Sequence, residues 1–353
     1  MATNDNPPGC DSDAAESPEG SGTATFSERL ERYSAARARA IVMLDHLRSA
    51  ARIDQDTPET EMTRGAAAKL SRCGDYLGFR NYFTVGETRL TEANFCKQHL
   101  LCPLCAIRRG SKALKAYLDR FEVVQERRKA LRPFLVTFTV TNGPDLSERF
   151  THLQKSLKRL HKQRRQHLAD GGRAAWTEAA RAQGAVWSYE VTNRGKGWHP
   201  HVHAIWLCDQ EPDMYALRSE WEAITGDSFM VDVRPMTEDE TGFASSFMEV
   251  FKYAVKFSDL DPADTLHAWQ NLRGRRLLGS FGCFRGVQVP EALEDELLDD
   301  LPFVWLLYRY QRGDYHLHQV HRYEDGHADG QVSGQTSGHG SDAAVSRARI
   351  PAA

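Results

Sequence analysis

Residues Trp198–Leu207 read WHPHVHAIWL and place three histidines at every second position of a hydrophobic run. Side chains alternate between the two faces of a β-strand, so His199, His201 and His203 would share one face. A single histidine in such a run is usually a hydrogen-bonded core residue, and three structural histidines remain the alternative reading. Imidazoles gathered on one face are typical of a metal site, so the run predicts a strand that carries metal ligands.

The histidine run lies within an ordered series of strand and helix patterns. Residues 133–141 (PFLVTFTVT), 185–192 (AVWSYEVT) and 229–235 (FMVDVRP) are rich in β-branched and aromatic residues and predict strands. Leucines near helical spacing predict a basic helix over 147–168, and a second helix is expected over 213–224. The order β-α-β-β-α-β predicts an α+β domain of the ferredoxin-like or RRM-like type with an antiparallel sheet. Both helices would cover one face, the first and third strands would be central, and the other face would be open.

A predicted hairpin supplies a further candidate ligand. Residues 193–197 (NRGKG) predict the turn between the second and third strands. If the turn is centred between its first glycine and its lysine, Glu190 lies opposite His201 and diagonal to His203, with Cβ separations of about 4.5–5.5 Å and 7–8 Å. Two imidazoles and one carboxylate leave coordination positions open and suit an exchangeable Mg²⁺ or Mn²⁺. His199 is the alternative to Glu190 as the third ligand.

Four of the seven cysteines predict a second metal site. Cys102 and Cys105 form a CPLC pair of the zinc-knuckle type, and Cys73 and Cys96 complete a set of four thiolates. In a cytoplasmic chain, a structural zinc is expected rather than disulfides. Two alternatives remain, namely His99 in place of Cys73 or Cys96, and a cluster that holds no metal.

Positive charge is concentrated in one part of a chain whose net charge is −3. Residues 106–169 contain 16 Lys or Arg against five acids, so this segment would suit a polyanion, although two solvated helix faces would have the same composition. A basic helix over 107–118 follows the knuckle and would direct Arg108, Arg109 and Lys112 at phosphates. Three residues further along the chain are also predicted to contact DNA, namely Lys252, Arg275 and Arg276.

Composition and length bound the domain organisation. The chain has 353 residues, 41% of them hydrophobic, which suffices for one large domain or two smaller ones. No long apolar run and no apolar leader segment occur, so we expect a cytoplasmic protein without membrane contact. Residues 1–24 and 324–353 are predicted to be disordered. Between them we expect a helical region with the cysteine cluster over 25–132, the sheet domain over 133–290, and a helix and hairpin over 291–323.

A candidate nucleophile lies downstream of the predicted sheet. Residues 241–260 (TGFASSFMEVFKYAVKFSDL) have a helical pattern in which Glu249 and Tyr253 share one face and Lys256 lies one turn from Tyr253. A tyrosine hydroxyl with a pKa near 10 is a poor nucleophile, but a metal ion and a nearby lysine can assist its attack on a phosphate. Glu249 would serve as a general base for water in a later step. Alone, this pair is typical of an ordinary helix surface, and the histidine strand upstream favours catalysis.

Three segments of the chain together resemble one protein family. They are FLVTFTVTN (134–142), EVTNRGKGWHPHVHAI (190–205) and EVFKYAVKFSD (249–259). These segments are similar to the rolling-circle plasmid replication initiators of the single-tyrosine type, which belong to the HUH endonuclease superfamily, named for its His-hydrophobe-His motif. The flanking segments NFCKQHLLCPLCAIRR (94–109) and LRGRRLLGSFGCFRG (272–286) also resemble those of that family. The histidines precede the tyrosine, whereas conjugative relaxases have the reverse order.

The resemblance implies a site-specific DNA nickase. Tyr253 would attack one phosphodiester of plasmid origin DNA that is single-stranded at the nick site, leaving a covalent 5′-phosphotyrosine and a free 3′-hydroxyl. His201 and His203 would bind the divalent metal, and Glu249 would serve in termination by hydrolysis. A host helicase and polymerase would be partners. His99 departs from the family pattern, which more often has a basic residue at that position.

Two other functional classes are also consistent with these motifs. A transposase of the HUH superfamily would share the nicking chemistry, although some of those have a second tyrosine where Tyr253 is alone. A zinc-dependent DNA-binding regulator without enzymatic activity would use its histidines structurally.

A second His-hydrophobe-His motif lies near the end of the chain. His316 and His318 also flank a hydrophobic residue, in a predicted hairpin that begins with residues 302–310. No helix with a candidate nucleophile follows them in the sequence, so a surface role is expected.

Overall fold

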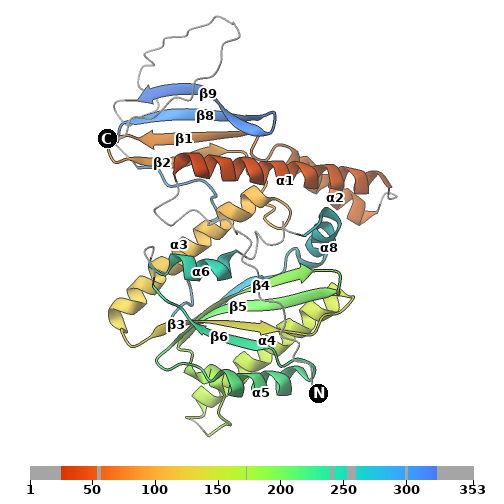
Figure 1. Cartoon of the computed structure of the whole chain (residues 1–353), viewed down its shortest axis with the longest axis vertical. Helices are drawn as coiled ribbons and strands as arrows, with labels where there is room; N and C mark the ends of the chain where they lie inside the picture. Colours follow the sequence, from red (N-terminus) through yellow and green to blue (C-terminus); the bar gives the residue numbers. More distant parts are fainter. Residues whose placement is uncertain are drawn as a thin grey trace, which may run out of the picture.

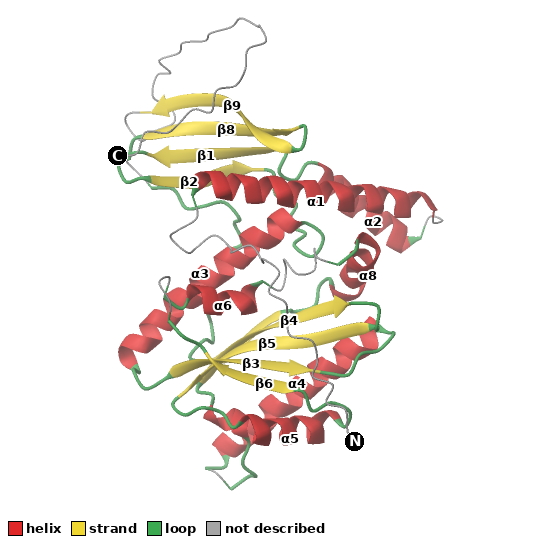
Figure 2. Ribbon diagram, in the orientation of Figure 1, coloured by secondary structure: helices red, strands yellow, loops and turns green. Residues whose placement is uncertain are grey.

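The computed structural model describes residues 25–53, 57–171, 173–238, 242–252, 260–298 and 301–323. These residues form two antiparallel sheets with helices packed against each of them, which confirms the α+β class (Figure 1, Figure 2). The two termini with a disordered composition lie outside the described residues, as do Tyr253 and Lys256. None of the described helices is long and apolar enough to span a membrane.

The larger sheet has the histidine strand near its middle. Its strands are β3 (Arg132–Thr139), β4 (Gly184–Asn193), β5 (Trp198–Cys208), β6 (Val231–Pro235) and β7 (Leu278–Gly282). They lie in the order β6-β3-β5-β4-β7. Helices α4 (Leu146–Ala169) and α5 (Met214–Thr225) complete the expected element order, and the first and third strands, β3 and β5, are flanked on both sides. Strand β7 was not expected, because its sequence LGSFG is short and contains two glycines.

The alternation of side chains in β5 divides the core of this domain into two parts. Val202, Ala204 and Trp206 belong to the core that α4 and α5 cover, whereas Ile205 and Leu207 face the other side. Helices α3 (Pro103–Arg127) and α6 (Ala244–Phe251) pack on that other side (Figure 1). The expectation of an open second face is therefore wrong for this part of the sheet, since α3 presents apolar residues at helical spacing that bury it. These residues are Ala113, Leu114, Tyr117, Phe121 and Val124.

The smaller sheet joins the two ends of the described chain. Its strands are β1 (Tyr76–Tyr82), β2 (Glu87–Ala93), β8 (Phe303–Gln311) and β9 (Asp314–Tyr323), in the order β2-β1-β8-β9. Helix α1 (Phe26–Ile53) packs against this sheet, where Phe26 meets Phe79 edge to face at 5.0 Å, and α2 (Pro58–Ser71) packs on α1. Segments from the two ends of the described part of the chain therefore form one structural unit (Figure 2).

Two expectations for this unit are corrected. The segment 25–132 is not purely helical, because it contains β1 and β2, and the described part of 291–323 has the expected hairpin but no helix. The two strands were missed for a reason that their sequences show. The sequences of β1 and β2, YLGFRNY and ETRLTEA, contain few β-branched residues. Strand β1 is stabilised in the sheet by pairing with β8 from the far end of the chain.

Candidate active site and metal centres

The three residues predicted to bind a divalent metal come together on β4 and β5. Glu190 pairs with His201, and Ser188 pairs with His203, which is the register expected from the hairpin. The Nε2 atom of His201 lies 3.3 Å from Glu190 Oε1, and that of His203 lies 3.4 Å from Glu190 Oε2. Glu190 is only 2% exposed. A positive charge stabilises a carboxylate removed from water in this way, and a cation bound between Glu190 and the two rings would supply one.

Hydrogen bonds behind the rings orient both histidines. His201 Nδ1 lies 3.3 Å from the carbonyl oxygen of His199, which can only accept, so Nδ1 donates and Nε2 of the neutral ring keeps its lone pair. His203 Nδ1 lies 3.1 Å from Thr137 Oγ1. The buried Nε2 of His203 makes no hydrogen bond within the described part of the chain. Nitrogen and carboxylate donors within 4.8 Å of one another are a donor set that fits a divalent cation.

His199 stands apart from this group. Its Nδ1 lies 2.5 Å from Oδ1 of Asn142, which follows the end of β3. Burial, and secondly the neighbouring His201, lower the pKa of His199 to about 4, so the ring is neutral near pH 7 and donates to the amide oxygen. Of the two candidates for third ligand, the structure places Glu190 rather than His199 with His201 and His203. Asn142 was not singled out from the sequence, where it directly follows the predicted strand 133–141.

Helix α6 brings Glu249 to the same strands. Glu249 Oε1 lies 3.9 Å from His203 Nε2, and Glu249 Oε2 lies 3.8 Å from Lys252 Nζ. The fully buried hydroxyl of Ser188 donates to the carbonyl oxygen of Val250 at 2.5 Å and ties α6 to β4. Glu249 and Lys252 were singled out from the sequence, but Ser188 was missed. The available signal was a small polar residue between two aromatic residues, Trp187 and Tyr189.

Helix α3 supports α6 from the side away from the sheet. Gly110 lies so close to α6 that a Cβ atom there would come within 2.9 Å of the carbonyl oxygen of Phe251. Seven residues on, Tyr117 stacks on the Phe251 ring at 5.3 Å. The described part of the chain then breaks after Lys252, so the predicted nucleophile Tyr253 and its neighbour Lys256 have no described position.

The four cysteines predicted as zinc ligands form a second group, from which His99 is absent. Cys73 Sγ lies 3.5 Å from Cys102 Sγ and 3.6 Å from Cys105 Sγ, and Cys96 Sγ lies 3.6 Å from Cys105 Sγ. All four are free thiols, three of them buried. Hydrogen bonds with neighbouring thiols hold the pKa of Cys73 far below its usual range, and the bond with Cys102 has the largest effect. The pKa of Cys102 is raised by its contacts with the other thiols, of which the contact with Cys105 has the largest effect, and by burial.

Arg108, the first of the basic α3 residues predicted to contact DNA, is buried. Arg108 is 2% exposed and donates to Tyr33 Oη at 3.1 Å, to the Leu293 carbonyl oxygen at 2.7 Å and to Asp295 Oδ1 at 2.6 Å. This corrects the expectation that Arg108 faces a phosphate, because its guanidinium is used to join α3 to the segment before β8. Arg109 is partly exposed and donates to the Pro290 carbonyl oxygen at 2.9 Å.

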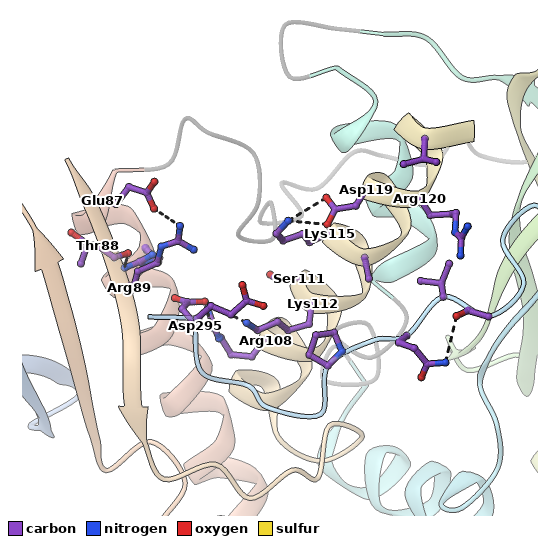
Figure 3. Close-up of a pocket in the computed structure, with 18 of the residues that line it drawn as sticks. Glu87, Thr88, Arg89, Arg108, Ser111, Lys112, Lys115, Asp119, Arg120 and Asp295 are labelled. Atoms are coloured by element: carbon purple, nitrogen blue, oxygen red, sulfur yellow. Dashed lines mark hydrogen bonds and ion pairs between the residues drawn. The ribbon is translucent and has the colours of Figure 1, made fainter. Parts of the chain in front are cut away.

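Lys112, Lys115 and Arg120 of this helix, together with Arg108, line a cavity of about 1060 Å³ between α3, β2 and residues 286–296 (Figure 3). Lys112 lies there 3.8 Å from Asp295, and burial lowers the pKa of Lys112. Lys115 pairs with Asp119 at 2.9 Å. Because acids of the same cavity neutralise these cations, it is not the uniformly positive surface that composition predicts.

Arg275 and Arg276 lie on the opposite face of the larger sheet from the histidine group. They line a cavity of about 480 Å³ with Lys158 and Trp187. Arg275 is held by the hydroxyl of Ser147 at 3.3 Å, whereas Arg276 is exposed. A DNA contact by these residues would therefore lie away from the candidate metal.

The second His-hydrophobe-His motif lies at the surface. His316 and His318 are exposed on β9, and His316 Nε2 lies 3.2 Å from the Gln311 carbonyl oxygen. Among the described residues, neither belongs to a group that could hold a metal. Their setting is consistent with the surface role expected for this motif.

Comparison with known proteins points to replication. Residues 87–304 match the model of a family described as "Replication protein". Two relatives, each named "Protein rep", come from Bacillus sp. and Bacillus amyloliquefaciens. Each is 24% identical over 271 residues, which cover 67% of this chain and 83% and 76% of the respective relatives. No solved structure matches. The family match includes Glu190, His201, His203 and Glu249, and three of the four clustered cysteines.

Proposed function

Because the chain belongs to the replication protein family of plasmid initiators, we propose that it cuts one strand of origin DNA through a covalent bond to Tyr253. One observation carries this proposal. Glu190, His201 and His203 lie together as a group that could hold a cation, and Glu249 lies 3.9 Å from His203 on α6, which ends two residues before Tyr253 in the sequence. The larger sheet would then be a ferredoxin-like HUH domain.

Glu190, His201 and His203 would hold Mg²⁺ or Mn²⁺, which when bound polarises a phosphate and offsets charge that develops on its oxygens. The chain itself sets the tautomer of His201 through the His199 carbonyl. It also keeps Glu190 out of water, which strengthens the attraction of the carboxylate for a cation. Thr137 behind His203 limits rotation of that ring.

In the nicking step, the Tyr253 oxygen would form a bond to phosphorus as the bond from phosphorus to the 3′ oxygen breaks. The tyrosine loses a proton and the leaving 3′ oxygen gains one, which yields a 5′-phosphotyrosine and a 3′-hydroxyl. Lys256 would support the phenolate and Lys252 the phosphate, because a positive charge nearby stabilises both anions. The 3′-hydroxyl would serve a host polymerase, and a host helicase would separate the strands.

Glu249 would act when replication ends. Its carboxylate is one third exposed and lies between His203 and Lys252, so water can reach it. There it would accept a proton from the water that cleaves the phosphotyrosine bond. A regulator without catalysis would use the histidines structurally, as partners of the buried Glu190, and would not need Glu249 beside His203.

The test is formation of a covalent adduct with single-stranded oligonucleotides that tile the plasmid origin, in the presence of Mn²⁺. We expect a protein–DNA band in a denaturing gel that disappears in Tyr253→Phe and in the double variant His201→Ala, His203→Ala. Tyr215→Phe is the matched control, since Tyr215 is 72% exposed on α5, and it should form the adduct normally. An adduct that persists in Tyr253→Phe would show that another residue is the nucleophile.

A further inference from the structure

The cysteine cluster lies where three separate segments of the chain meet. Cys73 follows α2, Cys96 follows β2, and Cys102 and Cys105 lie at the start of α3. These four sulfur atoms are not part of the candidate nicking site. Their position instead connects the smaller sheet to the long helix that runs on to the larger one (Figure 1).

The spacing of the sulfur atoms distinguishes between a disulfide and a metal. Three of the Sγ–Sγ distances are 3.5, 3.6 and 3.6 Å, and all four sulfur atoms lie within 4.8 Å of one another. A disulfide requires about 2.05 Å. Four sulfurs around a tetrahedral zinc with Zn–S bonds of about 2.3 Å lie about 3.8 Å apart. The cluster therefore needs to expand by only a few tenths of an ångström to hold zinc, whereas a disulfide would require much larger movements.

The surroundings of the cluster fit a bound anionic zinc–thiolate group. The backbone N–H of Cys96 points at Cys73 Sγ, with 3.4 Å between N and S, and such a bond stabilises a thiolate. The buried guanidinium of Arg37 donates to the carbonyl oxygens of Leu70 and Ser71, just before Cys73, and brings a positive charge to this region. Soft thiolate ligands in a closed tetrahedral set select zinc over the hard cations that suit the histidine group.

We propose that Cys73, Cys96, Cys102 and Cys105 bind one zinc ion that fixes the start of α3 and thereby supports α6. At the cluster, Gly74 adopts φ +68°, and a Cβ there would come within 2.6 Å of Leu104 on α3. Tyr315 of β9 donates to the Gly74 carbonyl oxygen at 2.6 Å, so the small sheet is anchored at the same point. Two turns along α3, Gly110 contacts the backbone of Phe251 on α6. The ion would therefore stabilise a continuous path from the smaller sheet to the helix that carries Glu249.

The first experiment measures zinc in the full-length protein purified under reducing conditions. We expect one zinc per chain by elemental analysis, and loss of nearly all of it in Cys102→Ser and Cys105→Ser. Cys283→Ser is the matched control and should keep its zinc, because Cys283 is a free cysteine outside the cluster. The double variant His201→Ala, His203→Ala should also keep it, which separates this site from the candidate nicking site. Zinc that survives in the cluster variants, or iron in its place, would overturn the assignment.

A second experiment uses the wild-type chain alone, in case the cysteine variants fail to fold. Removal of zinc by a thiol-reactive mercurial should release one equivalent, detected with a chelating dye, and Co²⁺ should then give the intense bands of tetrahedral thiolate coordination. Hydrogen exchange should speed up in the first turns of α3 and in α6, and stay unchanged in α5. Absence of a thiolate band would refute the site, and unchanged exchange in α6 would refute the supporting role. Neither result depends on whether the protein nicks DNA.

Discussion

Glu190→Gln replaces the buried carboxylate between His201 and His203 by an amide of nearly the same shape, and we expect opposite effects on stability and on metal binding. In the metal-free protein, Glu190 Oε1 lies 3.3 Å from His201 Nε2, and because His201 donates to the His199 carbonyl oxygen through Nδ1, these facing atoms of the carboxylate and the neutral ring are both acceptors. A glutamine amide would donate to one ring, a bond that contributes about 1 kcal/mol, and it carries no charge to desolvate. The free energy of unfolding without metal should therefore rise by about 1 kcal/mol.

Metal binding should change in the other direction. Loss of a residue that only orients a ligand costs about 10–100-fold in affinity, so loss of a charged ligand should cost at least about 100-fold, or about 2.7 kcal/mol. Calorimetric titration with Mn²⁺ measures this effect, and urea unfolding without metal measures the first. The exposed Glu222→Gln on α5 is the control and should change neither quantity. Wild-type Mn²⁺ affinity in Glu190→Gln, or a less stable metal-free variant, would show that Glu190 is a structural acceptor and not a ligand.

Three further predictions concern the support of the site. Ser188→Ala leaves the Val250 carbonyl unpaired in the core and should lower the free energy of unfolding by about 1–3 kcal/mol in urea, together with the rate of adduct formation; unchanged values would mean that α6 is not held here. Arg108→Gln should cost about 3–5 kcal/mol because the charge of Asp295 loses its closest cationic partner, and a variant of normal stability with weaker DNA binding would instead favour the phosphate contact predicted from sequence. Burial lowers the pKa of His161 to about 4, against about 6.5 in the unfolded chain. The unfolded state then binds the proton more tightly, so this residue reduces stability as pH falls from about 6.5 to 4, by about 3 kcal/mol in all, and His161→Gln should remove that part of the slope in urea titrations. An unchanged slope would place the titration elsewhere.

The parts of the structure that the sequence predicts correctly are those that depend on local patterns. The strands and helices between 133 and 235 follow from periods of two and of 3.6 residues, and the register that places Glu190 opposite His201 follows from one tight turn. The cysteine cluster follows from the spacing of Cys102 and Cys105, because residues three apart at a helix start lie on one side. Each of these inferences needs only neighbouring residues.

The parts that the sequence did not predict depend on contacts between distant segments. The smaller sheet forms because β1 pairs with β8, and the sequence of neither strand indicates which strand it pairs with. The burial of Arg108 follows from Asp295, which lies far along the chain in a segment without regular structure. A basic residue on a helix has the same sequence signature whether it faces DNA or a buried acid.

The candidate metal ligands on β5 lie between a fully buried part and a less covered end of one strand face. Leu207 and Ile205 are fully buried beneath α3 and α6, His203 and His201 come next with side chains 12% and 11% exposed, and His199 follows at the more open end. A ligand placed among the first two residues could not be reached by a DNA phosphate, and one at the open end would compete with water for its cation. Since α6 both closes the dry end and presents Glu249 at the boundary, the helix that buries the core also sets where on the strand a substrate phosphate would meet the metal.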